Sequence, residues 1–165
     1  MSISETERPV LEALDRLGIP FRRLEHPPVA TVAAAERHWA GLRGVHCKNL
    51  FLRNKKGNHH YLVVAPASKP VDLRALNAAL GEDRLSFASP ERLSRCLGLE
   101  PGSVSPFGLI NDAEKSVRVV VDKDLAGTAF LGFHPNTNTA TLEISGPDFE
   151  RFLEWTGHRV TRLAL

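Results

Sequence analysis

Residues 48–65, "KNLFLRNKKGNHHYLVVA", constrain the fold of this chain more than any other stretch. Two runs of apolar and β-branched residues lie on either side of Asn-Lys-Lys-Gly-Asn. This pattern is typical of two antiparallel strands joined by a tight turn. The sequence therefore predicts a β-hairpin, and hence a sheet, in the first half of the chain.

Helices and further strands are expected on both sides of this hairpin, and Gly and Pro mark most of their ends. Helices are expected at 4–18, where Ser4 and Glu7 fit a capping box, at 31 to about 42, and at 71–81, 89–98 and 146–155. Strands are expected at 19–26, at 116–124 and as a hairpin and a terminal strand in the last third, whereas 99–112 is expected to be a loop. No repeat or linker interrupts the pattern. It predicts a single α/β domain of the α+β type over residues 1–165, with a mixed, mostly antiparallel sheet flanked by helices.

Composition excludes several classes of protein. The 165 residues are 42% hydrophobic and 24% charged, which is ordinary for a globular domain with a full core. No stretch approaches the roughly 20 apolar residues of a membrane span. The N-terminus lacks the basic-then-apolar order of a secretory signal, so a cytoplasmic protein without membrane contact is expected.

The net charge of +2 is far below the excess expected of a protein that coats DNA. A local basic patch could still bind phosphates, although a solvated face is the commoner role of such charges. The candidates for that patch are Arg37, His38, Arg43, His46, Lys48, Arg53, Lys55 and Lys56.

Familiar site patterns are missing. The sequence contains no GxGxxG, GxxxxGK[ST] or GxSxG motif. Cys47 and Cys96 lack metal-ligand spacing and are expected to be reduced, packed thiols. His59 and His60 are adjacent on a predicted strand, so their side chains would face opposite sides. We therefore expect no metal and no cofactor.

The segment 133–145, "FHPNTNTATLEIS", holds more hydrogen-bonding side chains than a hairpin turn requires. This excess suggests a polar binding surface, with a self-capped loop as the alternative. Lys48 begins an apolar strand, so its side chain would point either outward or into the mouth of a cleft. The stretch "GSVSPFG" at 102–108 is a stiffened turn that could present backbone N–H groups to a ligand, although ordinary connections also use Gly and Pro.

Together, "KNLFLRNKKGNHHYLVV", "RLSFASPERL", "LGLEPGSVSPFGLIND" and "FHPNTNTATLEIS" resemble a known family. The resemblance is to the superfamily of YbaK and prolyl-tRNA-synthetase-associated editing domains, in particular to its freestanding branch that deacylates alanyl-tRNA(Pro). It covers about residues 5–163. By this resemblance, the near-invariant lysine of the family falls on Lys48, its GxxxP loop on 102–106 and its histidine motif on His134.

The resemblance implies hydrolysis of an aminoacyl ester at the 3′ end of a tRNA, with help from the 2′-OH of the terminal ribose. Such an ester is labile, so positioning, a placed water and oxyanion stabilisation can suffice without a covalent nucleophile. Lys48 and His134 are the implied catalytic residues. The implied substrate-binding residues are Asn49, Gly102, Ser103, Val104, Ser105, Pro106, Asn136, Thr137 and Asn138.

The implied partner is mischarged tRNA(Pro), with prolyl-tRNA synthetase or an elongation factor as candidate docking partners and the oligomeric state left open. Two alternatives remain. The chain could deacylate another mischarged tRNA, carrying cysteine, serine or threonine, because pocket volume decides which acid fits. It could also be a noncatalytic tRNA- or nucleic-acid-binding module of the same fold.

Overall fold

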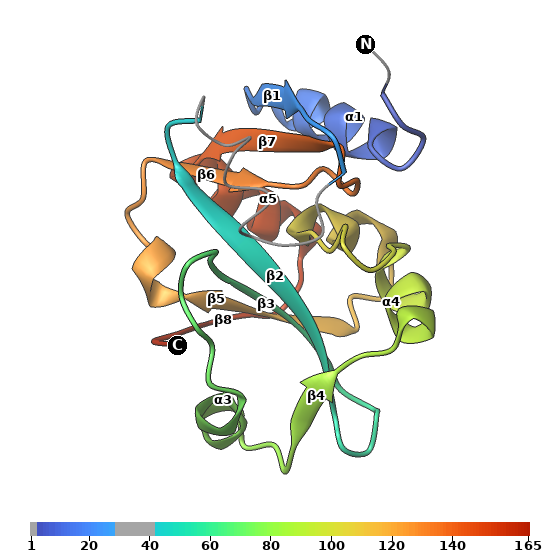
Figure 1. Ribbon diagram of the computed structural model, residues 1–165, viewed down its shortest axis with the longest axis vertical. Helices are drawn as coiled ribbons and strands as arrows, with labels where there is room; N and C mark the ends of the chain where they lie inside the picture. The colour runs from blue at the N-terminus through green and yellow to red at the C-terminus, as the bar shows by residue number, and fades with distance from the viewer. Residues whose placement is uncertain (1–2, 29–41) are drawn as a thin grey trace.

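The computed structural model describes residues 3–28 and 42–165, and a mixed sheet flanked by helices organises them (Figure 1). The strands are β1 (Arg22–Glu25), β2 (Val45–Asn54), β3 (His60–Pro66), β4 (Leu85–Phe87), β5 (Val117–Asp122), β6 (Phe130–Phe133), β7 (Ala140–Ser145) and β8 (Val160–Leu163). The helices are α1 (Arg8–Leu17), α3 (Leu73–Leu80), α4 (Pro90–Leu97) and α5 (Gly146–Thr156), with the 3-10 helices η1 (Pro106–Asn111) and η2 (Lys123–Leu125).

The sheet runs in the order β1-β7-β6-β2-β3-β5-β8, and β4 pairs with β2 outside this path. Strand β2 is antiparallel to β3 and β4 but parallel to β6. Strand β5 is parallel to both β3 and β8, so the sheet is mixed, as the sequence predicted. In Figure 1, β2 crosses the molecule diagonally and connects the upper strands to the lower ones.

The predicted hairpin is confirmed as β2 and β3, which pair from Cys47 opposite Pro66 to Arg53 opposite His60. Asn54 closes the turn, because its side-chain oxygen accepts from the backbone amides of the fourth and fifth residues after it, at 3.1 and 3.0 Å. Gly57 adopts a φ of 74°, which a side chain would disfavour. The turn residues therefore specify this connection locally.

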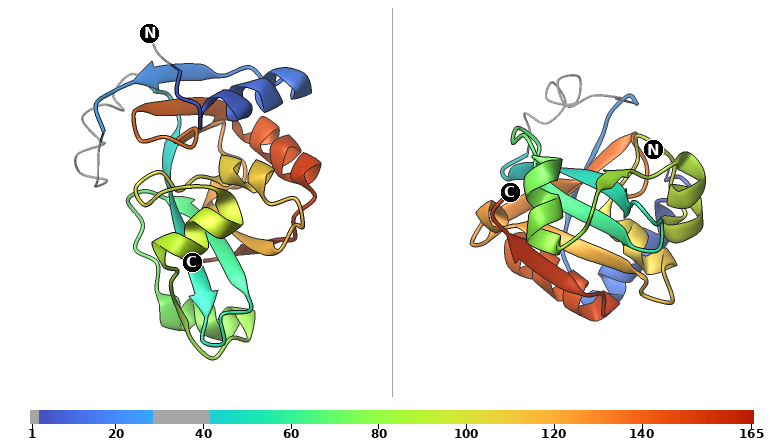
Figure 2. Two further views of the ribbon diagram at one scale, coloured as in Figure 1. Left: turned by 90° about the vertical axis from the view of Figure 1, so that its right-hand side faces the viewer. Right: turned by 90° about the horizontal axis from the view of Figure 1, so that it is seen from below.

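Two hydrophobic clusters fill the two sides of the sheet. The larger one lies under α1, α4, α5 and η1, where Phe107 meets the rings of Phe133 and Phe152 edge-on, with centroids 5.8 and 5.1 Å apart. The smaller one lies under α3 and includes Leu52 and Leu76. Figure 2 shows these helices on different sides of the strands.

The ends of most helices follow the sequence signals. The predicted helices at 71–81, 89–98 and 146–155 are found as α3, α4 and α5, each followed by a glycine in the left-handed region. The stretch expected to be a loop at 99–112 instead contains η1. The helix expected at 31 to about 42 falls almost entirely on residues outside the described part of the chain.

The first helix departs from its predicted start. It begins at Arg8, and the Ser4 hydroxyl accepts from the Glu7 amide at 3.2 Å, but the Glu7 carboxylate does not return to Ser4. That carboxylate is buried and pairs with the guanidinium of Arg23 on β1. Burying an unpaired carboxylate is costly, so Glu7 pairs with Arg23 and does not accept from the Ser4 amide. The capping box is therefore only half formed.

Glu143 on β7 anchors the chain just before β2. Its fully buried carboxylate accepts from Nε of Arg43 at 2.9 Å and from the amide of Gly44 at 3.0 Å. A Cβ at Gly44 would lie 2.2 Å from the carbonyl oxygen of Phe130, so only glycine fits there. Burial works to raise the pKa of Glu143, but the hydrogen bonds from Arg43 and Gly44 outweigh it and lower that pKa.

We predict that Glu143→Gln lowers the free energy of unfolding by about 2 kcal/mol, because charge-assisted hydrogen bonds to a buried group disappear. The matched change Glu150→Gln removes a half-exposed carboxylate on α5 and should cost less than about 0.5 kcal/mol. Urea unfolding of the three proteins measures both values. Because its pKa is lowered on folding, ionised Glu143 contributes to the free energy of unfolding. This contribution is complete above the unfolded-state pKa and is lost as pH falls through the folded-state pKa. Equal free energies of unfolding for the two variants at pH 7 would show that Glu143 does not stabilise the segment before β2.

Candidate active site

Lys48 and His134 belong to the same face of the sheet. In the parallel pairing of β2 with β6, Val45 lies opposite Leu131 and His46 lies opposite Gly132. Continuing this register by two residues brings Lys48 level with His134, where β6 has just ended. Because side chains alternate along a strand, both residues point away from the larger core.

The His134 imidazole is held in one tautomer. Its Nδ1 lies 3.0 Å from the carbonyl oxygen of Ala140, which can only accept, so Nδ1 carries the proton. Burial lowers the pKa of His134, and the charge of the nearby His26 lowers it further, against a smaller opposing effect of the Ala140 bond. The ring is therefore neutral near pH 7, with a lone pair on Nε2.

His26 is a neighbour of this site that the sequence analysis did not identify. Its ring centroid lies 6.0 Å from that of His134. Nδ1 donates to the carbonyl of Pro27 at 2.9 Å, and Nε2 meets the hydroxyl of Thr141 at 2.9 Å. The second of these contacts joins residues 115 positions apart in the sequence, and no local pattern predicts it.

The loop before η1 is a tight turn followed by free backbone donors. The amide of Ser103 donates to the carbonyl of Glu100 at 3.1 Å, and Gly102 has a φ of +88°, as a Pro-Gly turn of type II requires. Within residues 3–28 and 42–165, the amides of Val104 and Ser105 make no hydrogen bond to the protein. These two N–H groups could hold an oxyanion or a carbonyl oxygen.

This loop meets the histidine segment. A Cβ at Gly102 would lie 3.8 Å from the side-chain nitrogen of Asn138, so the two segments are neighbours. Figure 2 shows the loop projecting from the end of α4 toward the strands that carry the site. The GxxxP loop and the histidine segment, expected from the resemblance to act together, are therefore close in space.

Two asparagine side chains carry buried oxygens without partners in the described chain. Asn136, only 4% exposed, has a left-handed φ of 62°. Its Oδ1 has no hydrogen bond, and the same is true of Oδ1 of Asn49 on β2. A buried unsatisfied amide oxygen costs about 1–3 kcal/mol. An ordered water, an ion or a ligand can supply the missing donor to such an atom.

Other predicted site residues have structural contacts. The Ser105 hydroxyl accepts from the amide of Phe107 at 3.0 Å and caps η1, and Pro106 begins that helix. The hydroxyls of Thr137 and Thr139 bond to each other at 3.1 Å, so part of the segment is self-capped. Asn49 lies next to Lys48 on β2 and faces the opposite side of the sheet.

The described residues offer neither an activated thiolate nor a metal-binding cluster at this face. Both cysteines are free thiols, and burial raises the pKa of Cys47, which makes it a poor thiolate. No three His, Cys, Asp or Glu residues of the described chain are arranged to hold a metal ion. The arrangement instead offers one positive charge, one imidazole lone pair and two backbone donors. These groups suit the binding and hydrolysis of an ester on a phosphate-bearing ligand.

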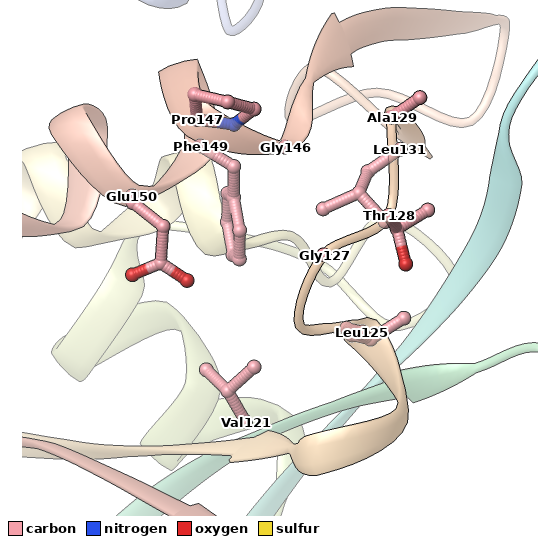
Figure 3. Close-up of a pocket in the computed structure, with 10 residues that line it drawn as sticks. All are labelled: Val121, Leu125, Gly127, Thr128, Ala129, Leu131, Gly146, Pro147, Phe149 and Glu150. Atoms are coloured by element: carbon pink, nitrogen blue, oxygen red, sulfur yellow. The ribbon is translucent and has the colours of Figure 1, made fainter.

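A separate pocket of about 280 Å³ lies where α5 begins, between β5 and β6. Figure 3 shows its lining, which is mostly carbon and includes the ring of Phe149 and the side chains of Val121 and Leu131. None of the predicted site residues lines it. This pocket is therefore distinct from the face that carries Lys48 and His134.

Comparison with known proteins shows similarity to aminoacyl-tRNA editing proteins. The family model of the aminoacyl-tRNA editing domain matches residues 26–152. The chain is 40% identical to the prolyl-tRNA editing protein ProX of Acetoanaerobium sticklandii over 161 residues, 98% of each chain. It is also 40% identical to prolyl-tRNA synthetase associated domain-containing protein 1 of Danio rerio, over 89% of this chain and 80% of the relative. A solved structure described as a candidate trans-editing enzyme for prolyl tRNA synthetase superposes with a TM-score of 0.72 at 25% identity, covering 99% of both chains.

We predict that the His134 ring titrates with a pKa below the ordinary value of about 6.5 and stays in the Nδ1–H tautomer above it. Burial disfavours the charged ring, and the Ala140 carbonyl selects the tautomer. Nitrogen-15 NMR of the imidazoles, with His134→Asn for assignment, measures both properties. A pKa at or above 6.5, or a proton on Nε2, would show that Nε2 of His134 is not the hydrogen-bond acceptor inferred here.

Proposed function

Because this chain belongs to the family of aminoacyl-tRNA editing domains, we propose that it is a trans-editing deacylase that hydrolyses the ester of mischarged alanyl-tRNA(Pro). The observation that carries this proposal is the near full-length similarity to a prolyl-tRNA editing protein. The geometry supports it, since the register brings Lys48 level with His134 and the loop with two free amides approaches the histidine segment at Asn138. Residues 1–165 would then act as one editing domain.

Lys48 would hold the negative end of the substrate. Its side chain is half-buried on β2 and makes no ion pair within the described chain, so its ammonium is available for an anion. The terminal phosphate of the tRNA or the ester carbonyl oxygen are the groups that such a charge would contact. A fixed charge at that position stabilises the oxyanion more in the transition state than in the ground state.

His134 and the 2′-OH would place the attacking water. The Nε2 lone pair of the neutral imidazole can accept from the water or from the ribose hydroxyl. The water oxygen adds to the ester carbonyl, the bond from that carbon to the ribose oxygen breaks, and a proton from the water ends on the ribose oxygen. The products are free alanine and a tRNA with its terminal hydroxyls restored.

The amides of Val104 and Ser105 would contact the aminoacyl group. Pro101 and Pro106 flank these residues and limit the movement of the loop. A pocket bounded by this backbone can admit a methyl side chain and exclude a pyrrolidine ring by size. This second selection is needed because a synthetase pocket built for proline rejects a smaller acid by only about 1–3 kcal/mol per missing methylene.

The substrate of this reaction would be a mischarged tRNA(Pro), received from prolyl-tRNA synthetase or an elongation factor in the cytoplasm. Consistent with this setting, none of the helices in residues 3–28 and 42–165 is long and apolar enough to span a bilayer.

We predict that Lys48→Ala reduces the rate of deacylation at least about tenfold, because charge-assisted contacts are worth roughly 1.5–3 kcal/mol. Its fold should persist, since the lysine contributes little to the core. Lys123→Ala, which removes an exposed lysine from η2, is the matched control and should keep the wild-type rate. Single-turnover release of alanine from alanyl-tRNA(Pro) measures the effect, and a folded Lys48→Ala protein with wild-type turnover would eliminate Lys48 from the mechanism.

A panel of esters tests the proposed specificity. We expect rapid hydrolysis of alanyl-tRNA(Pro) and preservation of prolyl-tRNA(Pro) at the same enzyme concentration, because a clash that displaces the ester from its reacting position is costly in rate. Seryl- and cysteinyl-tRNA(Pro) complete the comparison. Loss of the prolyl ester would contradict size exclusion, and a preference for the seryl ester would favour the alternative substrate class.

A further inference from the structure

Two arginine side chains from different elements meet at the turn between β2 and β3. A Cβ at Gly57 would lie 2.7 Å from Nη2 of Arg92 and 2.9 Å from Nη2 of Arg53. The two guanidinium groups therefore sit against the same glycine, one reaching from β2 and the other from α4. Arg95, exposed on α4, lies three residues after Arg92 and so on the same side of the helix.

The groups that hold these guanidiniums are all neutral. Nη1 of Arg92 donates to the carbonyl of Gly57 at 3.0 Å and to Nε2 of His60 at 3.1 Å. Arg53 donates to the carbonyls of Asn54 and Lys55 at 3.1 and 3.0 Å. These contacts fix the positions of the side chains without balancing their charge.

His60 does not add a compensating charge. Its Nε2 accepts from Arg92, which requires a neutral ring, and the ring stacks on Phe51 with centroids 5.6 Å apart. Burial lowers the pKa of His60, and the positive charges of Arg92, Arg95 and Arg53 lower it further. All three arginines thus add to the positive potential at one point.

No carboxylate of the described residues forms an ion pair with these three guanidiniums. Within the described chain, Arg53, Arg92 and Arg95 form no salt bridge, whereas Arg23, Arg43 and Arg162 each pair with a glutamate. Asp112, whose charge acts on His60, is already bonded by the amide of Val117 at 2.9 Å and by His158 at 2.9 Å. Glu91 is exposed and forms no ion pair there.

Like charges held together destabilise a free protein, and the positive end of α4 adds to the repulsion of Arg92. An anion would relieve this repulsion. Planar guanidiniums match the oxygens of a phosphodiester, and most of the N–H groups of Arg53 and Arg92 have no acceptor within residues 3–28 and 42–165. The exposed Lys55 and Lys56 lie on the same turn and extend the attraction.

The cluster is connected to the active site by two rigid elements. Arg53 lies five positions after Lys48 on β2, a span of about 16 Å along the strand, and the odd spacing directs the two side chains to opposite faces. Helix α4 begins near the turn and ends just before the loop that contains Gly102. An RNA strand that passes from one face to the other covers at least this distance, which at about 3.4 Å per stacked nucleotide corresponds to about five nucleotides or more from the ester. That distance reaches past the single-stranded 3′ end to the first pairs of the acceptor stem.

We propose that Arg53, Arg92 and Arg95 form a phosphate-binding surface for the acceptor stem of the tRNA, separate from the face that binds the ester. This proposal rests on the proposed function for the identity of the RNA. It also revises the basic patch considered from the sequence. Arg43 is occupied by Glu143, Arg37 and His38 lie outside the described residues, and α4 supplies two arginines that the patch lacked.

The test compares Arg95→Glu with Arg74→Glu. Both replace an exposed arginine on a helix and change the net charge equally, but Arg74 lies on α3, outside the cluster. The probe is an unacylated RNA hairpin with the acceptor stem and 3′ end of tRNA(Pro), and fluorescence anisotropy at several salt concentrations gives its Kd. Urea unfolding verifies that both variants are folded.

We expect Arg95→Glu to weaken binding of the hairpin severalfold at low salt and to reduce the slope of log K against log salt by about 0.7–0.9 for each phosphate that the variant no longer neutralises. Arg74→Glu should keep the wild-type Kd and slope. Arg92→Gln provides a second variant with the same expected direction. Wild-type binding by both Arg95→Glu and Arg92→Gln would overturn the proposal.

A short single-stranded oligonucleotide with the same 3′ sequence shows whether Arg95 contacts the acceptor stem or the single-stranded 3′ end. Its Kd should be the same for wild type and Arg95→Glu, and an equally weakened Kd with this probe would overturn the assignment to the stem. Hydrolysis of the alanylated oligonucleotide by Arg95→Glu should proceed at the wild-type rate. Failure of the wild-type enzyme to hydrolyse alanyl-tRNA(Pro) would instead contradict the proposed function, whatever the hairpin measurements show.

Discussion

The pairing of β2 on both of its edges is the constraint on which the rest of the structure depends. Its backbone groups bond to β3 on one side and to β6 and β4 on the other, so the strand cannot shift by one residue without exchanging its two faces. In the observed register, Cys47 and Phe51 enter the larger core. Lys48 is thereby directed to the opposite face, beside the end of β6.

The candidate active-site face is built from groups that are polar but mostly neutral. His134 is kept uncharged by burial, the amides of Val104 and Ser105 have no protein acceptor among the described residues, and Oδ1 of Asn136 is buried without a donor. Each such group lowers the stability of the empty protein. The arrangement is understandable if a ligand completes these hydrogen bonds, because the low polarity of the surroundings then strengthens each of them.

Local signals explain most of what the sequence could predict. Asn54 and Gly57 specify the hairpin, and Ser89, Pro90 and Gly98 mark the two ends of α4, so these elements were identified. The parallel pairing of β2 with β6 joins distant segments and has no local signature. His26 and Arg92 were missed for the same reason, since the importance of each depends on a partner far away in sequence. The resemblance supplied Lys48 and His134, and the register explains how they come to share a face.

The contact between His26 and Thr141 and that between Arg43 and Glu143 each close a loop of 100 residues or more. Contacts of this range form late in folding, because the entropy of loop closure must first be overcome. Ribosomal synthesis proceeds from the N-terminus, so Lys48 emerges long before β6 and β7 exist to stand beside it. A nascent chain of this protein therefore lacks the assembled candidate face while it is surrounded by the aminoacyl-tRNAs that feed its own synthesis. If that face cleaves the ester, the ability to do so arises only once the C-terminal third has folded.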